Sequence, residues 1–300
     1  MDKKTVNRIG KNAKITLKIL FNILLIASFL VGCKKDELKY EDIEYGNHAK
    51  QKLDISLPQN TALSTFPVML CIHGGAWNAG DKKDFDYVKE SLNNAGVAYV
   101  SINYRFIDDN ANCVNMLDDI ALALNFLKNN AQKYQLRSDK IALWGNSAGG
   151  HLALLYAYSR QSPINVAFVI GQVAPADFSD SNFFTPTGVY LLDGINALCN
   201  TQVTAAQLLA PGFSPPQQWI DFSPLYNAKT DSPPTILAYG GKDALVPYSN
   251  AVKMTQRLSD LGVVHQLITF PDSGHGLEND PVQSAQYYNV IKNYIENLLQ

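Results

Sequence analysis

The most reactive candidate in the chain is Ser147, which stands in the stretch Gly145-Asn146-Ser147-Ala148-Gly149. The pattern Gly-x-Ser-x-Gly is typical of a nucleophilic serine presented on a sharp turn between a strand and a helix. Glycine is needed at 145 and 149 because side chains there would collide across the turn. The five-residue pattern alone is weak, since it also occurs in ordinary loops. A nucleophilic Ser147 therefore requires an acid, a histidine and oxyanion donors elsewhere in the chain.

Two residues further along supply the acid and the base. Asp243 and His275 each follow an apolar run, and the carboxyl ends of such strands are where α/β folds place functional groups. The order Ser147, Asp243, His275 is the chain order of α/β-hydrolases. In this hypothesis His275 is the general base and Asp243 orients its imidazole, whereas the alternatives are a turn-holding aspartate and a surface histidine. Asp272 is a rival acid, but its nearness to His275 in sequence favours a role in shaping the loop.

The stretch His73-Gly74-Gly75-Ala76-Trp77 predicts the oxyanion hole. Two consecutive glycines let the backbone aim its N–H groups at one point, where they stabilise the charge that develops during acyl transfer. Gly74, Gly75 and the N–H of Ala148 are the predicted donors, and an ordinary Gly-Gly turn is the alternative. His73 is interpreted as a structural residue. No cofactor is predicted, and no Cys-x-x-Cys or histidine cluster indicates a metal site.

The elements that must position these residues follow from hydrophobic patterning. A half-buried strand near a sheet edge is predicted over 53–57, and strands buried on both faces over 67–72, 98–102, 141–144, 166–170, 235–239 and 266–270. Helical spacing is found over 114–134, 152–158, 252–261 and 281–299, with Asp280 placed to cap the last helix and Pro281 at its first position. Alternating strands and helices predict a mostly parallel, doubly wound α/β sheet. The order Ser147, Asp243, His275 then predicts the α/β-hydrolase fold.

One long segment interrupts this alternation. Residues 178–231 carry no long strand pattern and are rich in Pro, Gly, Asn and aromatic residues, with a short helix predicted over 204–209. A loop this long is expected to be functional or to carry its own helices. We interpret it as a cap-like insertion over the site, with a plain surface excursion as the alternative.

The N-terminal segment is predicted to be a targeting signal rather than part of the fold. Six basic residues precede an apolar run over 19–31, which is short for a membrane span and typical of a signal peptide. Leu30-Val31-Gly32-Cys33 resembles a bacterial lipoprotein signal, which implies lipidation of Cys33; an uncleaved anchor is the alternative. The charged run 34–37 resembles surface-export signals of some lipoproteins, or is a solvated linker. The predicted organisation is a signal peptide over 1–32, a polar tether over 33–45 and a catalytic domain over 46–300.

The net charge limits the classes of partner that the chain is expected to bind, and the cysteines are expected to be buried, free or paired. Of 25 basic and 27 acidic residues, six and one lie in 1–32, which leaves 19 against 26 and a net charge of −7. Such an acidic chain is not expected to bind nucleic acid, and its membrane contact would come from lipid. Cys71 is predicted to be a small buried residue, while Cys113 and Cys199 are left as free thiols or a disulfide.

Several motifs together resemble one enzyme family. The chain is similar to carboxylesterases related to hormone-sensitive lipase and to bifunctional feruloyl and acetyl-xylan esterases. The matching segments are Leu53-Asp54-Ile55, His73 to Trp77 with Gly80-Asp81-Lys82, Asn103-Tyr104-Arg105, Gly145 to His151, Gly241 to Pro247, and Gly274-His275-Gly276. Ala76 replaces the third glycine of the family's usual loop, and Asn146 replaces its frequent acidic residue. The loop His-Gly-Gly-x-Trp also resembles that of arylformamidases.

The resemblance implies a serine esterase for short acyl esters, with acetyl or feruloyl esters of polysaccharides among the substrates. The resemblance of Leu30-Val31-Gly32-Cys33 to a lipoprotein signal implies an extracytoplasmic, lipid-anchored enzyme on the periplasmic or surface face of a bacterial membrane. Two other classes stay open: an amide hydrolase of peptidase or arylformamidase type, and a non-catalytic binding protein on a hydrolase scaffold. The sequence leaves the oligomeric state and the acyl and alcohol specificity undecided.

Overall fold

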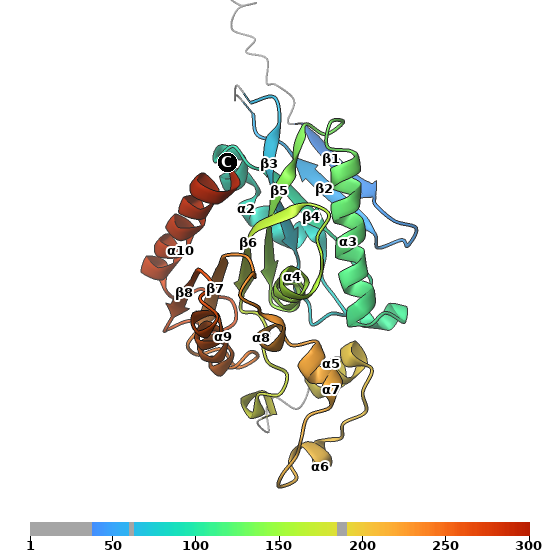
Figure 1. Cartoon of the computed structure of the whole chain (residues 1–300), viewed down its shortest axis with the longest axis vertical. Helices are drawn as coiled ribbons and strands as arrows, with labels where there is room; N and C mark the ends of the chain where they lie inside the picture. The colour runs from blue at the N-terminus through green and yellow to red at the C-terminus, as the bar shows by residue number, and fades with distance from the viewer. Residues whose placement is uncertain (1–37, 60–62, 185–190) are drawn as a thin grey trace, which may run out of the picture. The chain divides into compact units, whose positions relative to one another are not determined.

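A sheet of eight strands forms the centre of the computed structural model, which describes residues 38–59, 63–184 and 191–300 (Figure 1). The strand order is β1-β2-β4-β3-β5-β6-β7-β8, in which β1 and β2 are antiparallel to their neighbours and all other pairs are parallel. The strands are β1 (Lys39–Glu44), β2 (Lys52–Ser56), β3 (Phe66–Ile72), β4 (Ala98–Ile102), β5 (Leu136–Asn146), β6 (Asn165–Gln172), β7 (Thr235–Gly240) and β8 (His265–Phe270). The predicted mostly parallel α/β sheet is confirmed.

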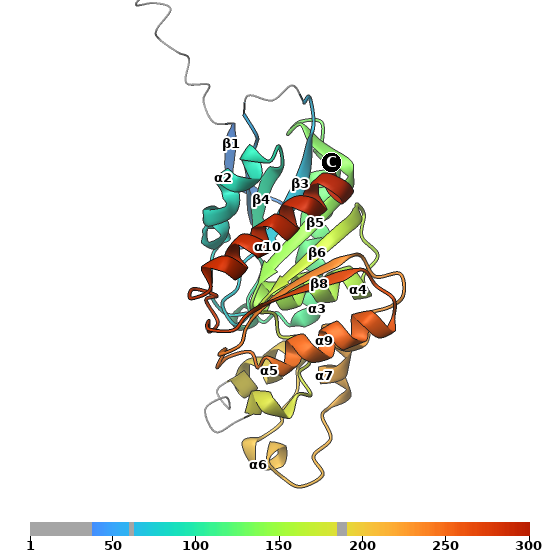
Figure 2. The same ribbon diagram turned by 90° about the vertical axis from the view of Figure 1, so that its left-hand side faces the viewer.

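Helices cover both faces of this sheet. On one face lie α3 (Cys113–Asn129), α4 (Ala148–Ser159) and α9 (Ser249–Asp260), and on the other α2 (Asp86–Asn94) and α10 (Pro281–Tyr294) (Figures 1 and 2). Successive side chains of a strand point to opposite faces of the sheet and therefore belong to two separate cores. Leu70 packs with α3 and α4, whereas the next residue, Cys71, packs with α2 and α10. Every residue of β3 is buried, as expected for a central parallel strand.

The edge strand β1 corrects the predicted tether over 33–45. Residues 39–44 pair with β2 instead of forming a linker, and 33–37 lie outside the described residues. The pairing register shifts between Tyr40 and Ile43, and Asp42 has φ 53°. This bulge puts Tyr40 and Ile43 on the same partly buried side although they are three residues apart. The bulge therefore breaks the alternation by which a strand is read from sequence, and the charged residues around it are typical of a protected edge.

The N-terminal predictions lie outside the described residues. These are the signal peptide over 1–32, the lipidation of Cys33 and the export signal over 34–37. The described chain forms one unit, Leu38–Gln300, which begins eight residues before the predicted start of the catalytic domain at 46. Among the helices of this unit, none has the length and apolar character that crossing a bilayer requires.

The segment between β6 and β7 lies beyond the carboxyl ends of the parallel strands (Figure 1). It carries α5 (Leu191–Cys199), α6 (Ala205–Leu208), α7 (Gln217–Asp221) and α8 (Pro224–Asn227). The short helix predicted over 204–209 is confirmed as α6. Trp219 is fully buried at the centre of the segment, where it stacks on Phe184 at 5.5 Å and donates to Thr201 Oγ1 at 2.9 Å. The segment therefore has a small core of its own.

The three described cysteines, Cys71, Cys113 and Cys199, are buried free thiols. Burial raises the pKa of each thiol, that of Cys199 to about 12, so the reactive thiolate form is suppressed. Within the described residues no group of three or more His, Cys, Asp and Glu side chains is arranged to hold a metal ion.

Candidate active site

Ser147 occupies a strained turn between β5 and α4. Its backbone has φ 53° and ψ −119°, a conformation that L-residues rarely adopt, and its N–H donates to Gln172 O at 2.8 Å. A Cβ at Gly145 would lie 2.0 Å from Gly149 O, and a Cβ at Gly149 would lie 2.0 Å from Ile72 O. Both glycines are thus required by close backbone contacts, as the sequence predicts for the turn.

The structure brings Ser147, His275 and Asp243 together. Ser147 Oγ lies 2.9 Å from His275 Nε2, and His275 Nδ1 lies 2.7 Å from Asp243 Oδ2. The other carboxylate oxygen of Asp243 accepts from the N–H groups of Leu245 at 2.8 Å and Val246 at 3.0 Å, and the carboxylate side chain is fully buried. Because an ionised carboxylate only accepts, Nδ1 carries the ring proton and Nε2 is free to accept from the serine hydroxyl.

The rival acid Asp272 faces elsewhere. Its carboxylate contacts Lys242 Nζ at 2.7 Å on an exposed surface. Asp280 stands at the N-terminus of α10 as predicted, but its side chain does not cap the helix. It accepts instead from Ser273 Oγ at 2.6 Å and from Asp272 N at 3.0 Å. Asp280 thereby fixes the loop that carries His275.

The predicted oxyanion donors lie beside Ser147. Gly74, Gly75 and Ala148 line the same hollow as Ser147 and His275. A Cβ at Gly74 would lie 3.2 Å from the Cβ of Ser147, and Gly75 has φ 108°, so both positions favour glycine. Ala76 has φ 48°, so it stands in a left-handed conformation where glycine would be unstrained, at a cost of about 1–2 kcal/mol. The assignment of Gly74, Gly75 and Ala148 as donors stays a prediction.

Two histidines support this loop. His73 is buried with Nδ1 2.7 Å from Gly74 O, and its ring stacks on Tyr104 at 4.5 Å, in keeping with the predicted structural role. His151 was not predicted: its Nδ1 accepts from Trp77 Nε1 at 3.2 Å, so Nε2 carries the proton and donates to Phe222 O at 2.7 Å. Burial lowers the pKa of His151 to about 4 and keeps the ring neutral. His151 thus joins the glycine loop to the segment between β6 and β7.

An apolar hollow of about 620 Å³ opens beside Ser147. We call it the apolar hollow, and its nonpolar lining consists of Ala76, Trp77, Ala79, Ala148, Pro175, Phe178, Phe183, Leu191, Ile195, Leu245 and Val246. The segment between β6 and β7 contributes five of these eleven residues, including both phenylalanines. The predicted cap-like insertion therefore contributes directly to the site, and the hollow is far larger than an acetyl group needs.

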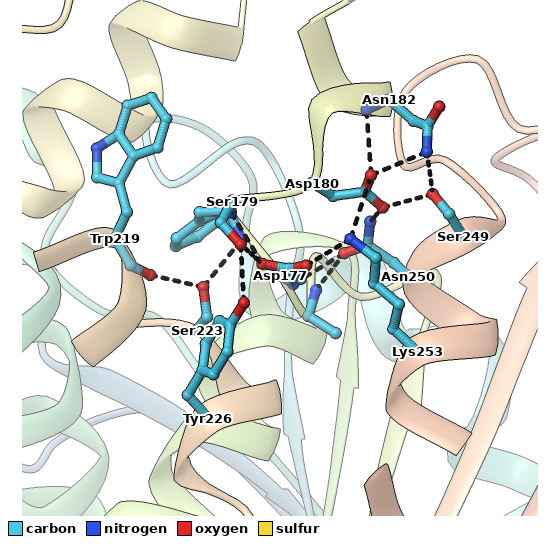
Figure 3. A network of polar contacts seen from close by, with 12 residues as sticks. Asp177, Ser179, Asp180, Asn182, Trp219, Ser223, Tyr226, Ser249, Asn250 and Lys253 are labelled. Carbon is cyan, nitrogen blue, oxygen red and sulfur yellow. Dashed lines mark hydrogen bonds and ion pairs between the residues drawn. The ribbon is translucent and has the colours of Figure 1, made fainter. Parts of the chain in front are cut away.

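A polar network holds the loop that begins this wall (Figure 3). Asp177 and Asp180 are both 1% exposed, and Lys253 Nζ contacts them at 2.8 and 3.4 Å. Partial burial lowers the pKa of Lys253, but hydrogen bonding and the charge of both carboxylates raise it overall. Asn250 Oδ1 accepts from the N–H groups of Ala176 and Asp177, and Asn250 Nδ2 donates to Asp180. Helix α9 thus fixes the loop after β6.

A second anchor fixes Phe178 itself through Ser223 and Trp219, which Figure 3 labels. Its N–H donates to Ser223 Oγ at 2.9 Å, and that hydroxyl donates to Trp219 O at 2.6 Å. The ring of Phe178 packs edge-on against Trp77 at 5.7 Å. Neither anchor was predicted, because the contacts that tie the loop after β6 to Ser223 and to α9 join residues 45 to 76 positions apart, and no local motif marks them.

Known proteins are similar to this chain over much of its length. The BD-FAE family model matches residues 53–258, which is more than half of the chain. Among curated proteins, the chain is 30% identical over 239 residues to the probable carboxylic ester hydrolase LipM of Mycobacterium tuberculosis, covering 76% of this chain and 54% of that protein. The chain spans about half the length of the curated relatives it matches.

Solved esterases share the fold. A truncated carbohydrate esterase from gut microbiota superposes with a TM-score of 0.68 at 20% identity, covering 88% of this chain and 97% of that one. An acetyl ester-xyloside bifunctional hydrolase from Caldicellulosiruptor lactoaceticus gives a TM-score of 0.63 at 19% identity, with 82% and 88% covered. At these identities the likeness establishes the α/β-hydrolase fold.

Proposed function

Because the chain belongs to the BD-FAE family, we propose that it is a serine hydrolase that cleaves carboxylic esters through an acyl-enzyme. The observation that carries this proposal is the unbroken run of contacts from Ser147 through His275 to Asp243, at 2.9 and 2.7 Å. The carboxylate at its end is buried and held by two backbone N–H groups. This geometry supplies a nucleophile, a general base and a fixed acid.

Acylation uses each of these groups in turn. Ser147 Oγ attacks the ester carbonyl carbon while His275 Nε2 takes its proton, and Asp243 stabilises the imidazolium that forms. The carbonyl oxygen becomes an oxyanion, for which the N–H groups of Gly74, Gly75 and Ala148 are the proposed donors. Each donor is expected to contribute about 3 kcal/mol to the barrier reduction. As the tetrahedral intermediate collapses, the imidazolium protonates the departing alcohol oxygen.

Deacylation repeats the sequence with water. His275 takes a proton as the water oxygen attacks the acyl carbon, and it returns that proton to Ser147 Oγ when the acyl–oxygen bond breaks. The carboxylic acid leaves and the resting triad is restored. Every proton moves through His275 Nε2, so its position 2.9 Å from Ser147 Oγ serves both halves of the reaction.

We further propose that the substrates are acyl esters of carbohydrates, with acetyl and feruloyl groups as the leading acyl classes. Two structural neighbours carry names that point this way, a carbohydrate esterase and an acetyl ester-xyloside hydrolase. The apolar hollow supports acyl groups larger than acetyl, since an aromatic acyl group fits within about 620 Å³.

The test is hydrolysis of short p-nitrophenyl esters by the purified chain without its first 32 residues. Ser147→Ala is expected to reduce kcat by a factor of about 10⁶, because the attacking oxygen is lost. Ser259→Ala, which alters an exposed serine on α9, is the matched control and should retain full activity. Persistent ester hydrolysis in Ser147→Ala would overturn the proposal. Hydrolysis of matched anilides faster than esters would instead favour an amide hydrolase.

We also propose that the protein is anchored outside the cytoplasm by lipid on Cys33. Support comes from the sequence alone: a basic stretch, a short apolar run and Leu30-Val31-Gly32-Cys33. Cys33→Ser should leave the signal unprocessed or release the protein from membranes. Unchanged processing and membrane fractionation of Cys33→Ser in the bacterial host would contradict the anchor.

A further inference from the structure

A second hollow, of about 220 Å³, adjoins the apolar hollow and shares two lining residues with it. Asn146 and Gly276 line both hollows, and they are the residues just before Ser147 and just after His275. We call this second space the polar hollow. An ester whose carbonyl is held at Ser147 therefore has one hollow available for each of its two halves.

The walls of the polar hollow come from the scaffold. Tyr87 lies on α2, Tyr288 lies on α10, and Asn146 and Gln172 end β5 and β6. Figure 2 shows α2 and α10 on the same face of the sheet. Tyr87 and Tyr288 are 53% and 44% exposed, so each presents aromatic surface to solvent at the rim.

The polar groups inside are already oriented. Gln172 Oε1 accepts from Trp144 Nε1 at 3.4 Å and from the Tyr287 hydroxyl at 3.2 Å, which fixes the direction of the amide. Tyr87, Gln172 and Asn146 line the same hollow, which therefore presents a phenol and two amides. Amide and phenol groups of this kind both donate and accept hydrogen bonds, as a ligand rich in hydroxyl groups requires.

The side chains that line the polar hollow also exclude charged classes of ligand. None of the residues that line the polar hollow, all of them in the described part of the chain, carries a charged side chain. A phosphate, a carboxylate or an amine would find no countercharge there. A neutral polyhydroxylated ring fits, because its hydroxyl edge matches the amides and phenols and its C–H face matches exposed tyrosine rings.

We propose that the polar hollow binds the sugar on the alcohol side of the ester, with Tyr87 and Tyr288 as the specificity-determining residues. This inference rests on the proposed function, since it assigns the alcohol half of that reaction. The apolar hollow then takes the acyl group. Gly276 borders both spaces next to His275, so an alcohol oxygen at this boundary lies where His275 protonates it as the ester bond breaks.

The experiment compares two acetyl esters, methyl acetate and acetylated xylobiose, in the wild-type chain and in variants, because the alcohol half of methyl acetate carries no ring that could contact the two tyrosines. Tyr87→Ala combined with Tyr288→Ala is expected to raise KM for acetylated xylobiose about tenfold, since each aromatic contact contributes roughly threefold. Both kinetic constants for methyl acetate should stay within twofold of wild type. Tyr87→Phe keeps the aromatic ring, so its KM for acetylated xylobiose should lie closer to the wild-type value than that of the double alanine variant. Val282→Ala, at an exposed position of α10 outside both hollows, is the control.

The outcomes separate the two levels of the proposal. Equal KM values for acetylated xylobiose in the wild type and the double variant, with methyl acetate still cleaved, would overturn the sugar subsite and leave the esterase intact. An equal loss on both substrates would also overturn it, because the tyrosines would then support the fold or the chemistry. Failure of the wild-type chain to cleave either ester would refute the proposed function itself.

Discussion

The apolar and polar hollows share Asn146 and Gly276 but are otherwise built by different parts of the chain. Both phenylalanines of the apolar hollow come from the excursion between β6 and β7, which a polar network ties back to α9 and α8. The polar hollow is made by α2, α10 and the ends of β5 and β6, which belong to the sheet and its covering helices. In the proposed assignment, the acyl half of the ester contacts residues of this insertion and the alcohol half contacts the scaffold. Changes in one wall are expected to alter selectivity for one half of the substrate.

The largest expected effect comes from a change in the triad of Ser147, His275 and Asp243. Asp243→Asn should lower kcat by about 10⁴ for every ester, because an amide facing Nδ1 favours the tautomer that cannot accept from Ser147. The measurement is kcat for acetyl and longer acyl esters. Asp272→Asn is the matched control, since that carboxylate contacts only exposed Lys242 among side chains of the described chain, and it should change kcat less than threefold. A large loss in Asp272→Asn with an active Asp243→Asn would exchange the two roles.

A smaller effect should be confined to the apolar side. Asn250→Ala removes the acceptor for two buried N–H groups and a donor to Asp180, so the free energy of unfolding should fall by about 3 kcal/mol. Because the loop carrying Phe178 loosens, kcat/KM for aromatic acyl esters should fall more than for acetyl esters. Urea unfolding and an acyl-length series measure both effects. Asn297→Ala, at an exposed site on the C-terminal turn, should change neither. An equal loss across all acyl groups would show that the network does not set acyl selectivity.

The link between the glycine loop and the insertion should depend on pH. Burial lowers the pKa of His151 from 6.5 to about 4, so the unfolded chain binds its proton more readily than the folded chain. The stability that neutral His151 contributes is complete above pH 6.5 and falls as the pH drops toward 4. Between pH 7 and pH 5 the loss is about 2 kcal/mol. In His151→Gln, which keeps an acceptor and a donor but does not titrate, urea unfolding should show that much less pH dependence. An unchanged pH slope would contradict this account.

The same comparison separates what the sequence predicts from what it does not. Local patterns predict the strands over 98–102 and 235–239, because burial on both faces gives continuous apolar runs. They also predict Asp243 and His275, because each residue follows the end of a strand. The bulge at Asp42 hides β1 because it breaks the period of two. The last helix of the prediction, 281–299, ends as α-helix at Tyr294 and continues as a π-helical turn.

The residues that form the walls of the two hollows could not be predicted from local sequence patterns, for a different reason. Helix α5 contains Gly194, which lowers helix propensity, and its role depends on packing against distant residues. Asn250 and Ala176 are hydrogen-bonded although they are 74 residues apart. Tyr87 and Tyr288 line the same hollow only because α2 and α10 cover the same face of the sheet. Tertiary contacts of this kind leave no spacing in the sequence, whereas the glycines around Ser147 do.

The most direct measurement is the mass of the intact chain after reaction with a p-nitrophenyl alkylphosphonate, followed by peptide mapping. The phosphonate traps the serine that attacks an ester-like centre. The account predicts a single phosphonyl addition on Ser147, complete loss of ester hydrolysis in step with labelling, and no addition in Ser147→Ala. Labelling at another residue, or an esterase that stays active after full modification of Ser147, would contradict it.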